Sequence, residues 1–263
     1  MADTAYEKVK AARAAKRPTA SDYIRGMLTD FVELHGDRRF ADDKAIVAGL
    51  ARLGGRSITV IGIEKGHSAK ERVAHAFGAP NPEGYRKALR LMKQAEKFRR
   101  PVLCLVDTSG AFCGIGAEER GQGQAIAECL NELSALKTPV ISVIIGEGGS
   151  GGALALSLAD EVWMLENSIY SVISPEGCAS ILWKDASKAE TAAQYLRLTA
   201  QDALELGIID RIIPEDGLGD DIFFTRLRAV LSGRFQALCA ASAEELLERR
   251  YARFRSIGAE NAQ

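Results

Sequence analysis

The sequence predicts an α/β protein in which a parallel sheet is covered by helices on both faces. Two continuous apolar runs, Pro101–Val106 and Pro139–Ile145, lack the alternation of polar and apolar residues, as expected of strands buried on both sides. Helical patterns flank these runs, one at Glu83–Arg99 and one that ends at Leu136. Strands that alternate with helices along a chain form parallel sheets.

The segment before these strands is expected to be an arm followed by a hairpin. Residues 3–17 form a polar helical pattern, and Ser21–Leu34 place apolar side chains on one stripe of a second helix. Two β-rich runs follow, joined by Gly54–Gly55, a sequence suited to a two-residue turn. We therefore expect a helical arm over residues 1–40 and a main domain over residues 41–263.

The elements after the hairpin continue the α/β pattern. A polar loop is expected at Gly66–Pro82, a short helix at Ala153–Ala159, short strands at Val162–Leu165 and Ile169–Ile173, and helices from Asp216 onward. Two glycine-rich loops leave the carboxyl ends of neighbouring parallel strands. They should face one crevice, because α/β sheets bind ligands at these ends.

Composition and charge exclude several classes of function. The 34 Lys and Arg residues balance 35 Asp and Glu residues, and aromatic residues make up only 6%, so nucleic-acid binding is not expected. No apolar run approaches the ~20 residues of a membrane span, and the first residues lack the apolar core of a signal peptide. Five cysteines without a C-x-x-C pair indicate neither disulfides nor structural zinc. We expect a soluble, cytoplasmic protein.

The segment Gly146–Leu156, GEGGSGGALAL, matches three functional patterns at once. The pattern G-x-G-x-x-G at Gly146, Gly148 and Gly151 is that of a dinucleotide-binding turn. The pattern G-x-S-x-G around Ser150 is that of a nucleophile elbow. Glycines at the start of a helix can also present backbone N–H groups to an oxyanion.

The dinucleotide interpretation would make the chain an NAD-dependent oxidoreductase. Strand, glycines and helix follow in the required order, but the helix at Ala153–Ala159 is short for such a unit, and a complete βα unit precedes the motif. The elbow interpretation requires a histidine near Ser150. His35, His67 and His75 all precede the motif, which excludes the chain order of the α/β-hydrolases. A convergent arrangement, for example of His67 or His75 with Asp107, stays open.

The oxyanion interpretation requires the least from the sequence. Glycines let the backbone approach a substrate closely, and the start of a helix adds N–H donors with partial positive charge. The preceding glycine-rich loop could supply a second set of donors at Gly110–Ala111. The structural alternative is that these glycines only form tight turns and close packing.

Several charged residues have both a structural and a functional interpretation. Glu118 and Glu119 start a helix, where acids suit the helix dipole, but paired carboxylates can also act as general acid and base, with Glu147 as a possible second acid. Three basic residues could bind a carboxylate or phosphate, or be surface charges: Lys65, Arg72 and Arg86.

Five longer blocks carry a resemblance to one family. They are His35–Leu53, Gly116–Ala127, Gly146–Leu156, Asn167–Lys184 and Leu198–Glu215. In this order, over roughly residues 20–215, they closely resemble the α subunits of bacterial acetyl-CoA carboxylase carboxyltransferases, and the last block also resembles the signature of the crotonase superfamily. The resemblance implies a crotonase-like fold, a spiral of ββα units preceded by the helical arm.

The resemblance also implies a reaction and its site. Enzymes of this family transfer a carboxyl group from carboxybiotin, which a separate protein carries, to acetyl-CoA, giving malonyl-CoA for fatty acid synthesis. The biotin ureido anion takes the methyl proton, so the protein need supply only positioned N–H donors. By resemblance, Gly151 and Gly152 would hold the biotin oxygen, Gly148 and Gly149 would shape the turn, and Gly110–Ala111 would form the neighbouring loop.

The implied partners are a β subunit, a biotin carboxyl carrier protein and biotin carboxylase, in an assembly similar to α2β2. The β subunit would bear the zinc ribbon, and no metal is expected in this chain. One loop departs from the family: DTSGAFCG stands where DTPGAYPG is expected, so that Ser109 and Cys113 replace prolines and Phe112 replaces a tyrosine. Losing two prolines could loosen this loop.

Overall fold

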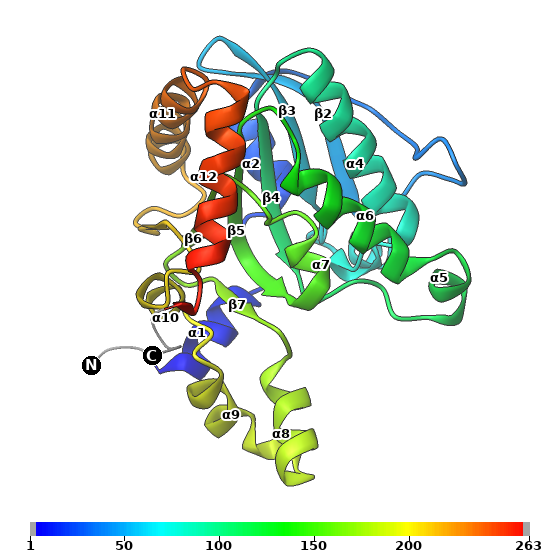
Figure 1. Ribbon diagram of the computed structural model, residues 1–263. Coiled ribbons are helices and arrows are strands. Elements are labelled where there is room, and N and C mark those ends of the chain that lie inside the picture. Colours follow the sequence, from blue (N-terminus) through cyan, green and yellow to red (C-terminus); the bar gives the residue numbers. More distant parts are fainter. Residues whose placement is uncertain (1–3, 260–263) are drawn as a thin grey trace.

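The computed structural model describes residues 4–259, which form one mainly parallel sheet with helices on both faces (Figure 1). The strand order is β1-β2-β3-β4-β5-β6-β8, and β7 pairs with the end of β5. The strands are β1 (Thr29–Glu33), β2 (Ile46–Leu53), β3 (Arg56–Ile63), β4 (Val102–Thr108), β5 (Val140–Gly149), β6 (Glu161–Leu165), β7 (Ile169–Ser171) and β8 (Arg211–Ile213).

The helices lie before, between and after these strands in the sequence. They are α1 (Ala5–Ala12), α2 (Ala20–Met27), α3 (Ala69–Ala74), α4 (Pro82–Lys97), α5 (Ile115–Glu119), α6 (Gln122–Ser134), α7 (Ser150–Leu154), α8 (Pro175–Trp183), α9 (Ala189–Leu196), α10 (Ala200–Glu205), α11 (Asp221–Leu238) and α12 (Ala243–Ser256), with 3₁₀ turns at Ala76–Gly78 and Ala186–Lys188. Among the described residues, no helix combines the length and apolar character that crossing a membrane requires.

Successive side chains of the central strands enter two different cores, one on each face of the sheet. In β4, Leu103 and Leu105 join the core formed with α2 and α11, whereas Cys104 and Val106 join the core formed with α4 and α6. All four side chains are fully buried. The predicted parallel sheet with both faces covered is therefore confirmed.

The predicted hairpin between the first two β-rich runs is also confirmed. Strands β2 and β3 pair antiparallel up to Leu53 and Arg56, so only Gly54 and Gly55 form the turn. Their φ angles of 55° and 83° lie in the left-handed region that glycine adopts without steric cost. From β3 onward, all neighbouring strands in the sheet are parallel.

The predicted helix over Ser21–Leu34 is wrong in its second half. The apolar stripe holds through Met27, after which β1 pairs antiparallel with β2 and extends the sheet. The free edge of β2 gives this segment backbone hydrogen bonds that the local periodicity does not reveal. The pattern over residues 3–17 forms a helix only at α1, and residue 3 lies outside the described part. The domain division at residue 40 stays a prediction.

Three further boundaries differ from the sequence prediction. The expected loop Gly66–Pro82 contains α3, which a capping box at Ser68 and Glu71 starts. Strand β5 does not end at Ile145 but continues through the glycines to Gly149, because β7 pairs with its last residues. The short helix predicted at Ala153–Ala159 is instead α7 at Ser150–Leu154, which follows the strand directly.

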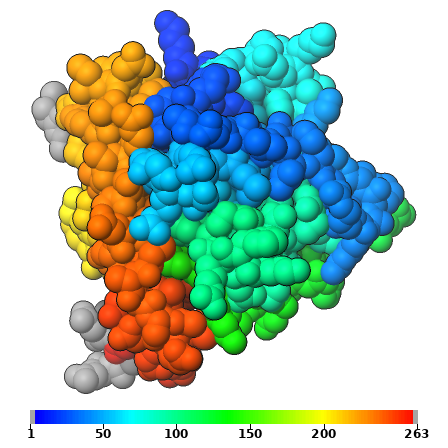
Figure 2. Space-filling model, turned by 90° about the horizontal axis from the view of Figure 1, so that it is seen from above, coloured from blue at the N-terminus to red at the C-terminus, as the bar shows by residue number. Residues whose placement is uncertain are grey.

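The C-terminal helix is attached to the body by one buried arginine. Figure 2 shows the C-terminal segment, coloured orange to red, along one side of the molecule. Arg250 on α12 is only 1% exposed and pairs with Asp160 at 2.8 Å. The same guanidinium donates hydrogen bonds to the backbone oxygens of Leu133, Leu136 and Thr138. It therefore joins α12 to the segment between α6 and β5.

Replacing this arginine by methionine should strongly destabilise the fold. Arg250→Met leaves the buried Asp160 carboxylate without its cation, which typically costs about 3–5 kcal/mol. Arg249→Met, on the exposed side of the same helix, should change the free energy of unfolding by less than about 0.5 kcal/mol. Urea unfolding followed by circular dichroism measures both values. Equal effects of the two substitutions would contradict the assignment.

Candidate active site

The two glycine-rich loops meet at the carboxyl ends of β4 and β5. These strands are parallel neighbours, and their last paired residues are Thr108 and Gly148. A Cβ atom on Gly149 would stand 2.3 Å from the carbonyl of Ser109, and one on Gly152 would stand 2.5 Å from the amide nitrogen of Ala111. The loops therefore touch backbone to backbone, as the parallel order predicted, and no side chain fits at either position.

Backbone N–H groups are available where α7 begins. The first three residues of a helix have no intrahelical acceptor for their N–H groups, and here they are Ser150, Gly151 and Gly152. Gly149 occupies the N-cap position, and no side chain caps the helix. A Cβ on Gly151 would meet its nearest atoms only at 3.8 Å, and this residue is partly exposed, whereas Gly152 is buried against Ala111. The site can thus offer N–H donors to an anion.

The nucleophile-elbow hypothesis finds no support in the geometry. Ser150 is exposed and has a φ of 52°, as at an elbow, but the histidines have other partners. His67 Nε2 lies 2.7 Å from Asp22 Oδ2, and His75 Nδ1 lies 2.5 Å from the backbone oxygen of Lys44. Asp107, the candidate acid, pairs with a lysine instead.

The dinucleotide hypothesis is not supported either. Such a motif places its glycines in the turn between a strand and a long helix. Here Gly146 and Gly148 lie within β5, and α7 has only five residues.

The family resemblance implied that Gly148 and Gly149 shape the turn. They lie within β5 instead, where they pair with Tyr170 and Ser171 of β7.

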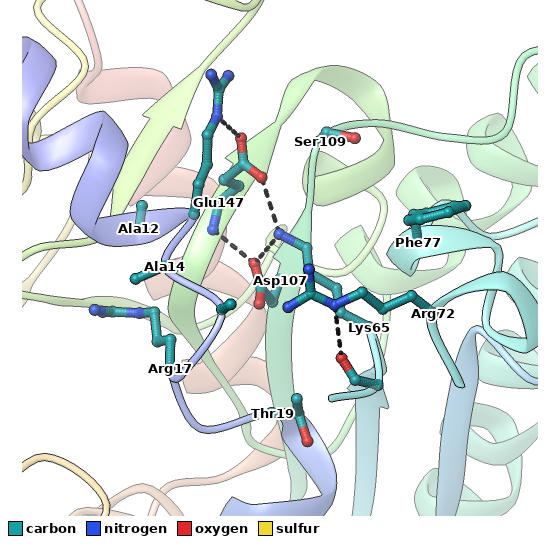
Figure 3. Close-up of a pocket in the computed structure, with 13 residues that line it drawn as sticks. Ala12, Ala14, Arg17, Thr19, Lys65, Arg72, Phe77, Asp107, Ser109 and Glu147 are labelled. Atoms are coloured by element: carbon teal, nitrogen blue, oxygen red, sulfur yellow. Dashed lines mark hydrogen bonds and ion pairs between the residues drawn. The ribbon is translucent and has the colours of Figure 1, made fainter. Parts of the chain in front are cut away.

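A buried cluster of charges lies behind the loops (Figure 3). Lys65 Nζ lies 2.6 Å from Asp107 Oδ1 and 2.9 Å from Glu147 Oε2. Burial alone would lower the pKa of Lys65, but the two carboxylates outweigh it and raise that pKa. For Glu147, Lys65 and Arg13 outweigh the opposing effect of burial and lower its pKa. Both groups are therefore charged at neutral pH.

The N-terminal arm forms one wall of a cavity of about 220 Å³ in front of this cluster. Arg13 and Arg17 from the arm line it together with Lys65, Arg72 and Ser109 (Figure 3). Neither arm arginine was predicted as a site residue, because an arginine in a polar helical pattern carries no local signal of a buried partner. The strand on the opposite side of the contact did carry a signal, because a charged residue within an apolar strand requires a partner of opposite charge.

Arg17 fixes the arm to the sheet. Its Nε donates to the backbone oxygen of Ile145 at 2.5 Å, and its two terminal nitrogens pair with Glu215. Glu215 also accepts hydrogen bonds from the backbone and side-chain nitrogens of Asn167, both at 2.8 Å. Burial raises the pKa of Glu215, but Arg17 and Asn167 outweigh this effect and hold it below its ordinary value of 4.5.

The remaining candidates lie apart from the cavity or at its rim. Arg72 donates to the backbone oxygen of Gly66 at 3.3 Å at the cavity rim. Arg86 pairs with Asp37 at 2.7 Å, outside the cavity. Glu118 and Glu119 are exposed on α5, which leaves their structural interpretation in place.

Hydrogen bonds hold the altered loop after β4 at Gly110 and at Phe112. The backbone nitrogen of Phe112 donates to Pro80 at 3.0 Å, and its oxygen accepts from Gln122 Nε2 at 2.9 Å. Thr108 Oγ1 bonds both the nitrogen and the oxygen of Gly110. Cys113 is exposed. The expected loosening is therefore countered by backbone hydrogen bonds on both sides.

No metal-binding group of three His, Cys, Asp or Glu side chains occurs within residues 4–259. The expectation of a chain without metal stays a prediction.

Comparison with known proteins identifies relatives over nearly the whole chain. A family model described as acetyl co-enzyme A carboxylase carboxyltransferase-like matches residues 3–258. An acetyl-coenzyme A carboxylase carboxyl transferase subunit alpha from Ruminiclostridium cellulolyticum is 58% identical over 259 residues, 97% of this chain and 98% of the relative. A protein from Natranaerobius thermophilus named subunits beta/alpha is 57% identical, and the match covers 97% of this chain and 43% of that protein.

Solved structures share the fold at low sequence identity. The transcarboxylase 12S core has a TM-score of 0.68 at 20% identity, over 85% of this chain and 44% of that one. A Pseudomonas malonate decarboxylase hetero-tetramer in complex with coenzyme A has a TM-score of 0.66 at 18% identity, over 85% of this chain and 93% of that one. These are crotonase-like structures, which confirms the predicted fold class.

The stability supplied by the arm anchor should depend on pH. Because the pKa of Glu215 is lowered on folding, its contribution is present above pH 4.5 and is lost as pH falls through the folded-state pKa. Glu215→Gln should therefore be less stable than the parent at neutral pH, and the difference should shrink below pH 4.5. Urea unfolding across this range measures it, with Glu205→Gln in an exposed ion pair as the control. A difference that stays constant at low pH would contradict the prediction.

Proposed function

This chain belongs to the acetyl-CoA carboxylase carboxyltransferase family, and we propose that it is the α subunit of such an enzyme. In this role it transfers the carboxyl group of carboxybiotin, carried by a separate protein, to acetyl-CoA and so yields malonyl-CoA for fatty acid synthesis. The observation that carries the proposal is the 58% identity to a named α subunit over 97% of the chain. The paired glycine loops are compatible with this chemistry.

The residues of this chain would act through their main chain. The carboxybiotin donor supplies the carboxyl group and, after giving it up, the base for the methyl proton. The N–H groups of Gly151 and Gly152 would hold the ureido oxygen. The loop at Gly110–Ala111 would supply the N–H group of Ala111 from the other side, because the N–H group of Gly110 donates to Thr108 Oγ1. Preorganised donors of this kind are each worth about 2.7–4 kcal/mol in a transition state. Gly148 and Gly149 would let β5 run close to its neighbours.

Three observations fit this assignment. The two loops touch at Gly152 and Ala111, which brings the two backbones together. The start of α7 lacks a capping side chain. The neighbouring cations Lys65 and Arg13 are paired with the carboxylates of Asp107 and Glu147, so the proposal assigns the donors to the main chain. No side chain is required as nucleophile or base.

The proposed partners follow from the same relatives. A β subunit is supported by the Natranaerobius protein, in which beta and alpha subunits form one chain. It would hold the acetyl enolate and bear the zinc ribbon, so that this chain supplies half of the active site. A biotin carboxyl carrier protein and biotin carboxylase would complete the system, in an α2β2 arrangement of the transferase subunits. A cytoplasmic location is part of the same proposal.

Carboxyl transfer should require both subunits. The purified chain is mixed with its β subunit, a carboxybiotin donor and acetyl-CoA, and malonyl-CoA is measured by liquid chromatography. We expect turnover from the pair and none from either subunit alone, because each would contribute one donor set. An assembled pair that forms no malonyl-CoA would reject the proposal, as would NAD(H)-dependent turnover by this chain alone.

Gly152 should tolerate no side chain, whereas Ser150 should tolerate the loss of its own. The Cβ in Gly152→Ala would stand 2.5 Å from the nitrogen of Ala111 and push the loops apart, and a displacement of about 1 Å can cost on the order of 100-fold in rate. Ser150→Ala keeps the backbone donors and should keep most of the turnover. Gly123→Ala, where a Cβ meets nothing within 4 Å, is the control. Loss of turnover in Ser150→Ala within an assembled enzyme would instead point to a serine nucleophile.

A further inference from the structure

The charged cluster behind the loops joins the two strands from which both donor sets depart. Asp107 lies three residues before Gly110 on β4, and Glu147 lies three residues before Ser150 on β5. One ammonium group, Lys65 Nζ, reaches both carboxylates, at 2.6 and 2.9 Å. The lysine itself lies in the loop after a third strand, two residues past the end of β3.

The contact between β4 and β5 also includes the backbone. The amide of Glu147 donates to Asp107 Oδ1 at 2.8 Å. A Cβ on Gly146 would stand 2.4 Å from the same carboxylate oxygen, so glycine alone lets the carboxylate lie against β5. Asp107 is 5% exposed and Glu147 is 8% exposed. The relative position of the two strand ends is therefore set by directional bonds as well as by the sheet.

The N-terminal arm adds a second cation to Glu147. Arg13 Nε lies 2.7 Å from Glu147 Oε1, and its NH1 group lies 2.8 Å from Glu176 in the first turn of α8. Glu147 thus has one cation on each oxygen, Lys65 from the buried side and Arg13 from the half-exposed side. Through Lys65 and Arg13, the carboxylate of Glu147 is linked to the segments after β3 and α1, to β4 and to α8.

Stability alone does not explain such a cluster. Desolvation of buried charges offsets most of their attraction, and well-packed apolar side chains often stabilise a fold equally well. What charged groups add is fixed geometry, because each hydrogen bond sets a distance and a direction. The cluster lies three residues from each loop, where a small shift would move the N–H donors.

We propose that Lys65, held between Asp107 and Glu147, is a positioning residue that sets the spacing between the loop at Gly110–Ala111 and the donors at Gly151–Gly152. It touches no reacting atom. The inference rests on the proposed carboxyl transfer and adds a role for side chains that the backbone mechanism does not use.

The test uses the assembled α and β subunits with saturating acetyl-CoA and carboxybiotin donor. Lys65→Met should lower kcat by about 10- to 100-fold, as expected for donors displaced by up to about 1 Å, and should leave both KM values within about threefold. Lys65→Arg should recover part of the loss, since it restores a cation. Lys93→Met, which removes an exposed lysine paired with Glu132 at 2.7 Å, is the matched control and should keep the parent kcat.

A second pair of variants keeps the test valid if Lys65→Met does not assemble. Arg13→Gln removes the half-exposed cation, and Glu147→Gln removes the shared carboxylate charge. Each should lower kcat at unchanged KM, and the combined variant should lose less than the product of the two single losses, because both act through one group.

Two outcomes would overturn the inference. A parent-like kcat in assembled Lys65→Met, or in both Arg13→Gln and Glu147→Gln, would show that the cluster does not position the donors. A rise in KM without a fall in kcat would assign the cluster to substrate binding instead. Either result would come from a parent complex that makes malonyl-CoA, whereas a parent complex without transfer would reject the proposed function itself.

Discussion

The contact between two backbones at the ends of β4 and β5 is the constraint on which the site depends. Gly149 lies against Ser109, and Gly152 lies against Ala111, at distances that leave no space for a Cβ atom. Because parallel pairing sets Thr108 beside Gly148, both loops start at the same level of the sheet. Only main-chain groups fit at this contact. A site built in this way can stabilise an anion with N–H donors and needs no reactive side chain.

The sheet above this contact limits where charge can be placed. Its central strands are buried on both faces, so a charged residue within them requires a partner of opposite charge. Asp107 and Glu147 are such residues, and both lie at the carboxyl ends, where Lys65 can reach them. The same end of the sheet therefore holds the glycine loops, the charged cluster and the cavity.

The N-terminal arm belongs physically to this region of the molecule. Helix α1 packs against Ile169 of β7 and Ala193 of α9, and Arg13 and Arg17 reach β5 directly. The relatives match this arm together with the sheet, since the family model begins at residue 3. The solved neighbours, at 20% identity or below in the two cases compared, establish the fold alone. Family membership therefore rests on the sequence relatives, and the solved structures add the fold.

Local sequence determined the buried strands, the Gly54–Gly55 hairpin, the two loops at one edge and, through long blocks, the family. Apolar runs and turn residues act within a few positions, so their signal is present in the chain itself. The tertiary structure alone decided that β1 joins the sheet, that β5 continues to Gly149 by pairing with β7, and that Arg13 reaches Glu147 across 134 positions. These contacts join distant segments whose partners no local pattern specifies, because pairing energy depends on which surface is left open.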